Sequence, residues 1–329
     1  MDGILVIDKP VGLTSHDVVA RVRRVLGERR IGHTGTLDPG ASGVLPLVVG
    51  RATRLARFLS AGDKSYDAVI ELGFSTDTGD AGGTPVNPGR PFERPSRTAV
   101  ESALDQFRGT FLQQPPAYSA KKIDGTRSYR LARRRKRQDA PPALPALASV
   151  TASAIDVVSL ERNNITLRIV CSAGFYVRSL AHDLGEWLGT GGHLVELRRT
   201  RSGDFTLADA IALDVIERDR DAAMTALVPP ARTLLRFSSV VLTVEGTERA
   251  SHGRDLDPSH LLSIASTTAD PEPGATLPET RLRSAERRFE PSPPPAPQWV
   301  KLLDAQGTLV GIGRVTSASG TLHPSVVLE

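Results

Sequence analysis

The stretch from Gly32 to Gly43 constrains this chain more than any other part of its sequence. It carries four glycines in twelve residues, and Pro39 follows Asp38 directly. Glycine reaches backbone conformations closed to other residues and lets a backbone approach a ligand closely, and the proline favours an extended conformation at Asp38. We expect an irregular loop over residues 31–43 that displays His33 and Asp38. An Asx-type turn at Asp38, with glycines that merely permit the bend, explains the same pattern.

Strand and helix patterns alternate around this loop, which indicates a mixed α+β domain. Ser15 is the expected N-cap of a helix whose apolar stripe ends before Gly27. The sequence predicts strands over residues 4–7, 44–49, 65–74, 154–160 and 165–171, and further helices over residues 98–107, 128–137 and 176–188. The 329 residues allow one large domain and a smaller one. We assign residues 1–235 to a catalytic domain, with an excursion from the core at about 113–145.

The composition changes after residue 235. Residues 267–297 are rich in Pro, Glu, Ser and Arg, which is typical of a poorly ordered surface insertion. The flanking segments, Val240 to Arg254 and Trp299 to Val315, indicate a small β-rich module, the second with a hairpin turn at residues 304–307. We therefore expect a second domain over residues 236–329.

Charge and cysteine usage narrow the function classes. The net charge of +4 suits a polyanionic partner, and the basic residues gather in two groups, although a solvated face explains such runs equally well. Cys171 is the single cysteine, so neither a disulfide framework nor a cysteine zinc site is expected. The seven histidines form no H-E-x-x-H pattern. No apolar run reaches the length of a bilayer span, so we expect a cytoplasmic protein without membrane contact.

A resemblance to a known family gives these patterns a function. The run GHTGTLDPGASGVLP, from Gly32 to Pro46, resembles the nucleophile loop of the TruB family of bacterial tRNA pseudouridine-55 synthases, with Asp38 at the position of the family's obligatory aspartate. The resemblance continues, in family order, at residues 3–14 (GILVIDKPVGLT), 64–80, 115–122 (PPAYSAKK), 174–178 (GFYVR) and 197–203 (LRRTRSG). It implies an α+β pseudouridine synthase fold with a mixed, largely antiparallel sheet. The β-rich C-terminal module more loosely resembles a PUA RNA-binding domain.

The resemblance also implies roles for individual residues. Asp38 is expected to be the nucleophile, and Arg178 to pair with it and keep it ionised and aimed. Tyr66 and Tyr176 are expected beside a flipped uracil, where an aromatic face replaces lost base stacking. Tyr66 is also expected to be catalytic, because a phenol near the sugar could move a proton. The remaining expected substrate contacts are Leu197, His33 and Asp80. Without the resemblance, both tyrosines and Leu197 are explained as core residues, Arg178 as a surface arginine and Asp80 as a turn residue.

The implied substrate is uridine 55 in the T-loop of tRNA, modified by a monomer without cofactor or metal. Contacts to RNA phosphates are expected from the two basic groups, Arg133, Arg134, Arg135, Lys136 and Arg137, and Arg198, Arg199 and Arg201. Two alternatives remain open. One is a guide-RNA-dependent, dyskerin-like synthase acting on ribosomal RNA, and the other is a chaperone that binds and folds the T-arm, either without catalysis or as a second role of the enzyme.

Overall fold

A computed structural model describes residues 1–86, 92–136, 140, 143–265, 299–316 and 321–328. The predicted insertion at 267–297 and the basic residue Arg137 lie outside the described residues, and the side chain of Arg135 is not described. The chain divides into two compact units, Met1–Pro229 and Pro230–Glu329. No helix within the described ranges is long and apolar enough to cross a membrane.

The first unit is built on a ten-stranded sheet with the order β12-β1-β3-β10-β4-β9-β8-β5, to which β2 adds beside β3 and β11 beside β10. The pairs β1 with β12 and β3 with β10 are parallel, and the other pairs are antiparallel. The expected α+β class with a mixed, largely antiparallel sheet is thus confirmed. The strands are β1 (Gly3–Lys9), β2 (Ile31–His33), β3 (Ala41–Val49), β4 (Lys64–Leu72), β5 (Gly109–Gln113), β8 (Ala148–Glu161), β9 (Asn164–Cys171), β10 (Gly192–Ser202), β11 (Phe205–Thr206) and β12 (Ile211–Ala212), with a separate hairpin of β6 (Lys122–Ile123) and β7 (Thr126–Arg127).

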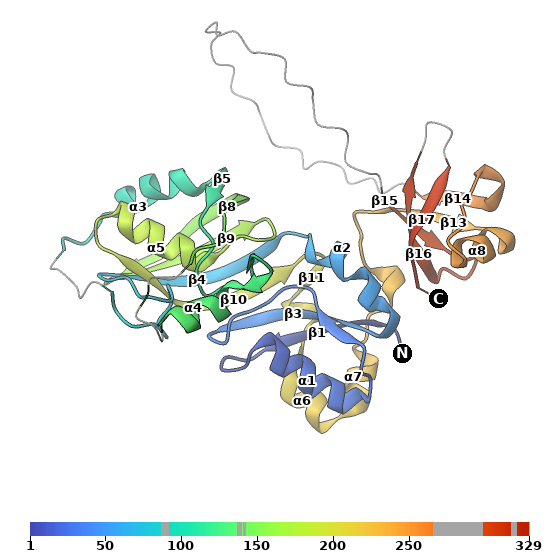
Figure 1. Cartoon of the computed structure of the whole chain (residues 1–329), viewed down its shortest axis with the longest axis horizontal. Coiled ribbons are helices and arrows are strands. Elements are labelled where there is room, and N and C mark those ends of the chain that lie inside the picture. Colours follow the sequence, from blue (N-terminus) through green and yellow to red (C-terminus); the bar gives the residue numbers. More distant parts are fainter. Residues whose placement is uncertain (87–91, 137–139, 141–142, 266–298, 317–320, 329) are drawn as a thin grey trace, which may run out of the picture. The chain divides into compact units, whose positions relative to one another are not determined.

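Besides α2 and α4, the helices of this unit form two groups beside the sheet (Figure 1). One group, α1, α6 and α7, lies beside β1 and β3, and the other, α3 and α5, lies near the β5 end of the sheet. The helices are α1 (Ser15–Leu26), α2 (Ala56–Ser60), α3 (Arg97–Leu104), α4 (Ser128–Lys136), α5 (Val177–Trp187), α6 (Leu213–Arg218) and α7 (Arg220–Thr225), with short 3-10 segments at Gly50–Leu55, Asp105–Phe107 and Leu207–Asp209. A continuous hydrophobic core joins α1, α3 and α5 to the sheet.

Helix α1 shows how local sequence sets an element boundary. Thr14 accepts a hydrogen bond from the backbone of Asp17, whose carboxylate in turn accepts from the backbone of Thr14, and this capping box starts the helix. Gly27 ends it in the left-handed conformation, with φ of 68°. The predicted N-cap, Ser15, is therefore wrong by one residue, and its hydroxyl is left for another contact. The predicted loop over residues 31–43 is shorter than expected, because Ile31–His33 pairs with β3 and β3 already begins at Ala41.

The second unit holds a five-stranded sheet with the order β14-β13-β15-β16-β17. Its elements are β13 (Ser238–Leu242), α8 (Val244–Ser251), β14 (Leu261–Ala265), β15 (Trp299–Leu303), β16 (Leu309–Val315) and β17 (Leu322–Val327), with 3-10 segments at Pro230–Arg232 and Pro258–His260. Ala250 of α8 packs with Leu242 and Leu302 in the core of this unit. The predicted hairpin around residues 304–307 is confirmed as β15 and β16, so the β-rich character expected of this region holds.

Candidate active site

The predicted nucleophile, Asp38, lies in the loop that joins β2 to β3. The backbone N–H of Ala41 donates to the carbonyl oxygen of Asp38 at 3.0 Å. This bond closes a four-residue turn with Pro39 at its second position, where the fixed φ of proline is favoured. The side chain of Asp38 is 42% exposed. The loop thus presents its carboxylate where a ligand can reach it.

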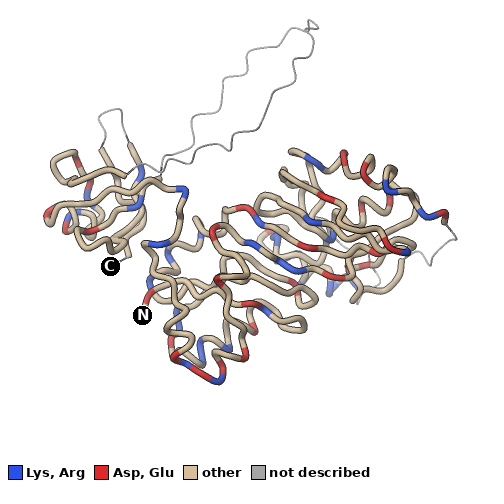
Figure 2. Tube along the Cα trace, turned by 180° about the vertical axis from the view of Figure 1, so that it is seen from behind, with Lys and Arg blue, Asp and Glu red and all other residues tan. Residues whose placement is uncertain are grey.

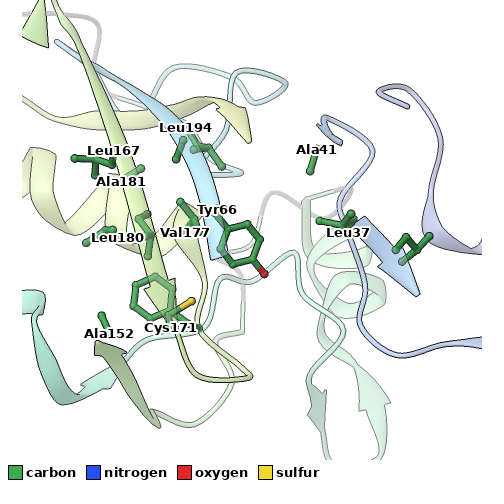
Figure 3. Close-up of a cluster of buried hydrophobic side chains, with 14 of the residues drawn as sticks. Leu37, Ala41, Tyr66, Ala152, Leu167, Cys171, Val177, Leu180, Ala181 and Leu194 are labelled. Carbon is green, nitrogen blue, oxygen red and sulfur yellow. The ribbon is translucent and has the colours of Figure 1, made fainter. Parts of the chain in front are cut away.

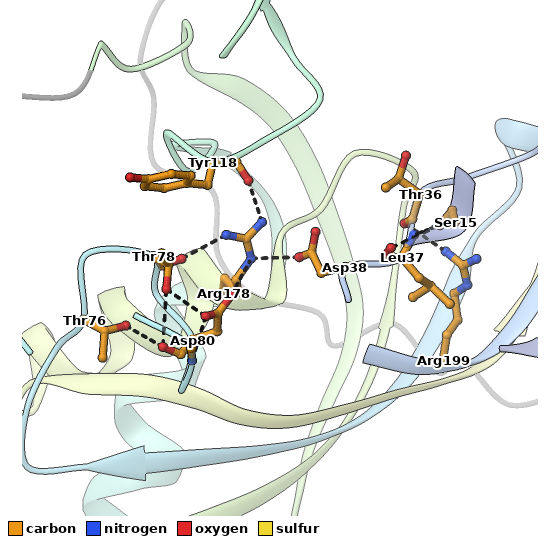
Figure 4. A network of polar contacts seen from close by, with 11 residues as sticks. Ser15, Thr36, Leu37, Asp38, Thr76, Thr78, Asp80, Tyr118, Arg178 and Arg199 are labelled. Atoms are coloured by element: carbon orange, nitrogen blue, oxygen red, sulfur yellow. Dashed lines mark hydrogen bonds and ion pairs between the residues drawn. The ribbon is translucent and has the colours of Figure 1, made fainter. Parts of the chain in front are cut away.

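Arg178 contacts that carboxylate from the first turn of α5. Its Nε lies 2.9 Å from Oδ2 of Asp38, and its own side chain is only 6% exposed. Nη1 donates to the carbonyl oxygen of Thr78 at 2.9 Å, and Nη2 donates to that of Tyr118 at 2.8 Å (Figure 4). A buried charge is stable only when it is paired and hydrogen-bonded, and these carbonyls also fix the plane of the guanidinium. The predicted pair is present, and Arg178 is a buried rather than a surface residue.

Asp80 shapes the loop that carries Thr78. One of its carboxylate oxygens, Oδ1, accepts from the hydroxyl of Thr78 at 2.7 Å and from the backbone N–H of Gly82 at 3.1 Å. The other, Oδ2, lies 3.8 Å from Nε of Arg178. Asp80 therefore forms a turn, as one sequence interpretation has it, and it also faces the arginine beside Asp38.

Tyr66 and Leu197 lie on adjacent strands, β4 and β10, and on one face of the sheet. In the antiparallel register Tyr66 opposes Arg199 and Ala68 opposes Leu197, and residues two apart in a strand share a face. Tyr66 is 9% exposed, and its ring points out of β4 toward the side where Leu37 lies (Figure 3). Burial raises the pKa of Tyr66, an effect that Arg199 opposes and Asp38 increases. Its phenol is therefore a neutral group within the electrostatic reach of Asp38.

Tyr176 directly precedes α5 and is half-buried. The amide of Gln113 holds its backbone by two bonds, donating to the carbonyl of Tyr176 at 3.0 Å and accepting from its N–H at 2.8 Å. Burial raises the pKa of Tyr176, while Ser119 and Arg178 oppose the rise and Asp38 adds to it. The charge of Asp38 thus affects both predicted tyrosines, Tyr66 from β4 and Tyr176 from the start of α5.

His33 ends β2 and packs edge to face against His16, with ring centroids 5.2 Å apart. Burial, with smaller contributions from the charges of His16 and Arg199, lowers the pKa of His33 to about 4. Its imidazole is consequently neutral near pH 7. It stands at the end of the strand that leads into the Asp38 loop, rather than in the loop itself as the sequence predicted.

Lys9 is a residue of this region that the sequence reasoning missed. It is fully buried at the end of β1, and its Nζ donates to the carbonyl of Pro10 at 2.8 Å. Burial lowers the pKa of Lys9 to about 8, while Asp38 opposes that change and Arg199 contributes to it. The available signal was a lysine two residues after the apolar run 4–7, a position on the same strand face as Ile7.

The carbonyls of Thr78 and Tyr118, which hold Arg178, were also missed. No sequence signal identifies them, because any residue type supplies a backbone carbonyl.

The described residues of the first basic group lie on α4. Arg133 and Arg134 are exposed, and the guanidinium of Arg133 lies 5.6 Å from the ring centroid of Tyr129. Lys136 instead forms an ion pair with Asp77 at 2.5 Å. Figure 2 shows Lys and Arg interspersed with Asp and Glu along the chain, so local pairing decides which cations are available to an anion.

The second basic group requires a correction. Arg199 is 1% exposed, and its guanidinium donates to carbonyl oxygens of the Asp38 loop and of β3. A buried guanidinium bound to the backbone cannot contact a phosphate, so the predicted role of Arg199 is wrong. Arg198 pairs with Asp8 at 2.7 Å, and Arg201 donates to the hydroxyl of Ser65 at 3.2 Å; both remain partly exposed.

No cluster of three or more His, Cys, Asp or Glu residues capable of holding a metal ion occurs in the part of the chain that the structure describes. The groups assembled around Asp38 are a carboxylate, a guanidinium and two phenols. Such a set can stabilise positive charge, act as a nucleophile and move protons.

Two protein-family models match consecutive parts of the chain. The model of the TruB family pseudouridylate synthase N-terminal domain matches residues 23–177, and the model of the tRNA pseudouridylate synthase B C-terminal domain matches residues 178–236. Together they include every residue named around Asp38 except Lys9 and His16.

Similar proteins of known name extend over the whole chain. The tRNA pseudouridine synthase B of Solibacter usitatus is 40% identical and covers 100% of this chain and 100% of its own length. The enzyme of the same name from Burkholderia lata is 42% identical over 88% of this chain and 87% of its own. That of Geobacter sulfurreducens is 43% identical over 77% and 82%.

Solved structures show a shared fold. A chain of a Cbf5-Nop10-Gar1 complex has a TM-score of 0.70 and 24% identity, and the alignment covers 99% of this chain and 85% of that one. A chain of an H/ACA ribonucleoprotein bound to a substrate RNA containing 2′-deoxyuridine gives 0.68 and 22%, with the same coverage. At these identities the likeness concerns the fold alone.

Proposed function

Because this chain belongs to the TruB family of pseudouridylate synthases, we propose that it isomerises uridine 55 in the T-loop of tRNA to pseudouridine, with Asp38 as nucleophile. The relatives of similar length carry the name tRNA pseudouridine synthase B, which supports tRNA as the substrate. The observation that carries the proposal is the exposed carboxylate of Asp38, aligned at 2.9 Å by a buried arginine.

The reaction is an isomerisation and needs no redox partner. The bond between C1′ and N1 breaks, the uracil turns while bound, and a bond between C1′ and C5 forms, while C5 loses a proton and N1 gains one. An aspartate serves this sequence either by covalent attack on the ribose or the base, or by stabilising positive charge as the glycosidic bond breaks. Arg178 restricts the carboxylate to one orientation in either case.

The surrounding side chains supply a place for an extruded base. Removing a base from its stack costs a few kcal/mol, which aromatic contacts partly restore. Tyr66 and Tyr176 both lie within the electrostatic reach of Asp38, and Leu197 shares the sheet face of Tyr66. We assign these three residues and His33 to binding of the flipped nucleotide, and the phenol of Tyr66 also to proton transfer. The T-arm would contact the exposed arginines of α4, Arg133 and Arg134, and the second unit would act as a PUA-like RNA-binding domain.

Two alternative functions have some of these features. A guide-RNA-dependent synthase has the same fold in the H/ACA ribonucleoprotein, but an identity of 22% to this chain carries no functional argument. A T-arm chaperone without catalysis has no need of a carboxylate and a buried arginine held in register, so the pair favours an enzyme. Folding of tRNA as a second role is compatible with the same binding surface.

The test is to incubate the purified chain with an unmodified tRNA transcript and to map pseudouridine by position. We expect a single product at uridine 55 and none in a matched transcript that carries cytidine there. Modification confined to other positions, or activity on ribosomal RNA that requires a guide RNA, would contradict the proposal.

A further inference from the structure

The backbone on either side of Asp38 is tied to elements distant in the sequence. Resting on the function proposed above, we propose that Ser15 and Arg199 are positioning residues, which hold the loop so that the Asp38 carboxylate meets its substrate in one geometry. Neither residue touches the carboxylate in the structure. Both residues contact peptide groups of the loop, and Arg199 also forms a side-chain hydrogen bond with Tyr66.

Ser15 is attached to the residue that immediately precedes Asp38. Its hydroxyl accepts from the backbone N–H of Leu37 at 2.8 Å and donates to the carbonyl oxygen of Leu37 at 3.1 Å (Figure 4). A serine hydroxyl can donate and accept at once, so both peptide groups of Leu37 are fixed by a single side chain. Ser15 is 1% exposed and Leu37 3% exposed. Because Thr14 caps α1, this hydroxyl serves the loop alone.

Arg199, on β10, binds the loop before Asp38 and the strand β3 that follows it. Its Nη2 donates to the carbonyl of Gly35 at 3.1 Å and its Nη1 to that of Thr36 at 3.5 Å, and its Nε donates to the carbonyl of Val44 at 2.7 Å. The close approach of the Arg199 backbone to β3 depends on a glycine at residue 43. A Cβ atom at Gly43 would lie 2.2 Å from the carbonyl oxygen of Arg199.

The residue after Asp38 is held as well, because the backbone N–H of Gly12 donates to the carbonyl of Pro39 at 2.8 Å. Tethers therefore surround the nucleophile on both sides, while its side chain remains 42% exposed. A displacement of about 1 Å in a reacting group costs on the order of 100-fold in rate. Loss of one tether should accordingly impair the chemical step without removing any contact to RNA.

The experiment compares Ser15→Ala with Thr14→Ala, two hydroxyl deletions at adjacent residues. Thr14→Ala weakens the start of α1 but removes no bond to the loop. Single-turnover rates at saturating tRNA, tRNA affinity and thermal unfolding are measured for both. We expect Ser15→Ala to lose roughly 10- to 100-fold in rate with nearly unchanged affinity, and Thr14→Ala to lose stability but keep the wild-type rate.

A second variant, Arg199→Lys, keeps the charge but cannot reach three carbonyls, and we expect the same split between rate and affinity. If Ser15→Ala does not fold, Arg199→Lys tests the inference. Wild-type rates in both folded variants, or equal rate losses in Ser15→Ala and Thr14→Ala, would overturn the inference. If the wild-type chain itself formed no pseudouridine in tRNA, the proposed function would fail instead.

Discussion

The guanidinium of Arg178 and the carboxylate of Asp38 meet at 2.9 Å although one is buried and the other is reachable from solvent. The arginine is held by the carbonyls of Thr78 and Tyr118, so it is fixed independently of the aspartate. The pair therefore has a rigid member and a reactive member, which is the arrangement that a preorganised site requires.

Replacing Asp38 separates catalysis from binding. We expect Asp38→Ala and the nearly isosteric Asp38→Asn to abolish pseudouridine formation while tRNA affinity stays largely unchanged, because the carboxylate adds no favourable contact to a phosphate. Product mapping together with filter binding measures both quantities. Turnover by either variant would refute the assigned nucleophile.

Arg178→Lys should damage both activity and stability. A lysine cannot serve Asp38 and two carbonyls at once, and a buried acceptor left unpaired costs about 1–3 kcal/mol. We expect a lower free energy of unfolding in chemical denaturation and a lower single-turnover rate. Arg198→Lys is the matched control, since its pair with Asp8 is 41% and 34% exposed and surface pairs contribute about 0–1 kcal/mol. Equal stability losses would count against the buried role of Arg178.

Tyr66 can be tested by removing first its hydroxyl and then its ring. If the phenol moves a proton, Tyr66→Phe should lower the single-turnover rate by roughly 100-fold or more. Tyr66→Leu should lower it further, because the aromatic face is also lost, and both changes should exceed the change in tRNA affinity. Similar losses in rate and affinity for Tyr66→Leu would speak against a part in chemistry.

Periodicity in the sequence predicted many elements of the first unit but not how they pair. The helix ending at Gly27 and the hairpin of β8 and β9 follow from local patterns, as does the α+β class. The parallel pairing of β3 with β10, which brings Gly43 beside Arg199, joins segments far apart and leaves no local trace.

The candidate site, too, could be predicted from the sequence only in part. Asp38 and Arg178 could be predicted from motifs, whereas the burial of Arg199 could not be seen without knowing that residues 192–202 form a strand. Once that strand is known, alternation places Arg198 and Arg199 on opposite faces, and only one of them can stay at the surface. Ser15 was missed for a related reason, because two adjacent hydroxyl residues compete for one cap and the choice of Thr14 depends on Asp17.

The exposed arginines of α4 predict a salt-dependent part of binding. We expect the double variant Arg133→Gln and Arg134→Gln to bind tRNA more weakly and to flatten the dependence of log affinity on log salt by about 0.7 to 0.9 per lost phosphate contact. Lys136 is left intact because it pairs with Asp77. The control is Arg218→Gln, an exposed arginine on α6. An unchanged slope in the double variant would show that these arginines are part of a solvated face and do not contact tRNA phosphates.

His33 gives a prediction about pH. Burial, with the charges of His16 and Arg199, lowers its pKa from 6.5 to about 4. Between about pH 4 and 6.5 this imidazole is protonated in the unfolded chain but neutral in the folded chain. The free energy of unfolding therefore rises with pH in this window. The stabilisation is fully present above about pH 6.5 and is lost as the pH falls toward 4. Denaturant titrations across the window should show a steeper pH dependence for the wild type than for His33→Gln. His182→Gln, at an exposed position of α5, should keep the wild-type slope, and parallel curves for all three proteins would show that His33 is not a buried neutral imidazole.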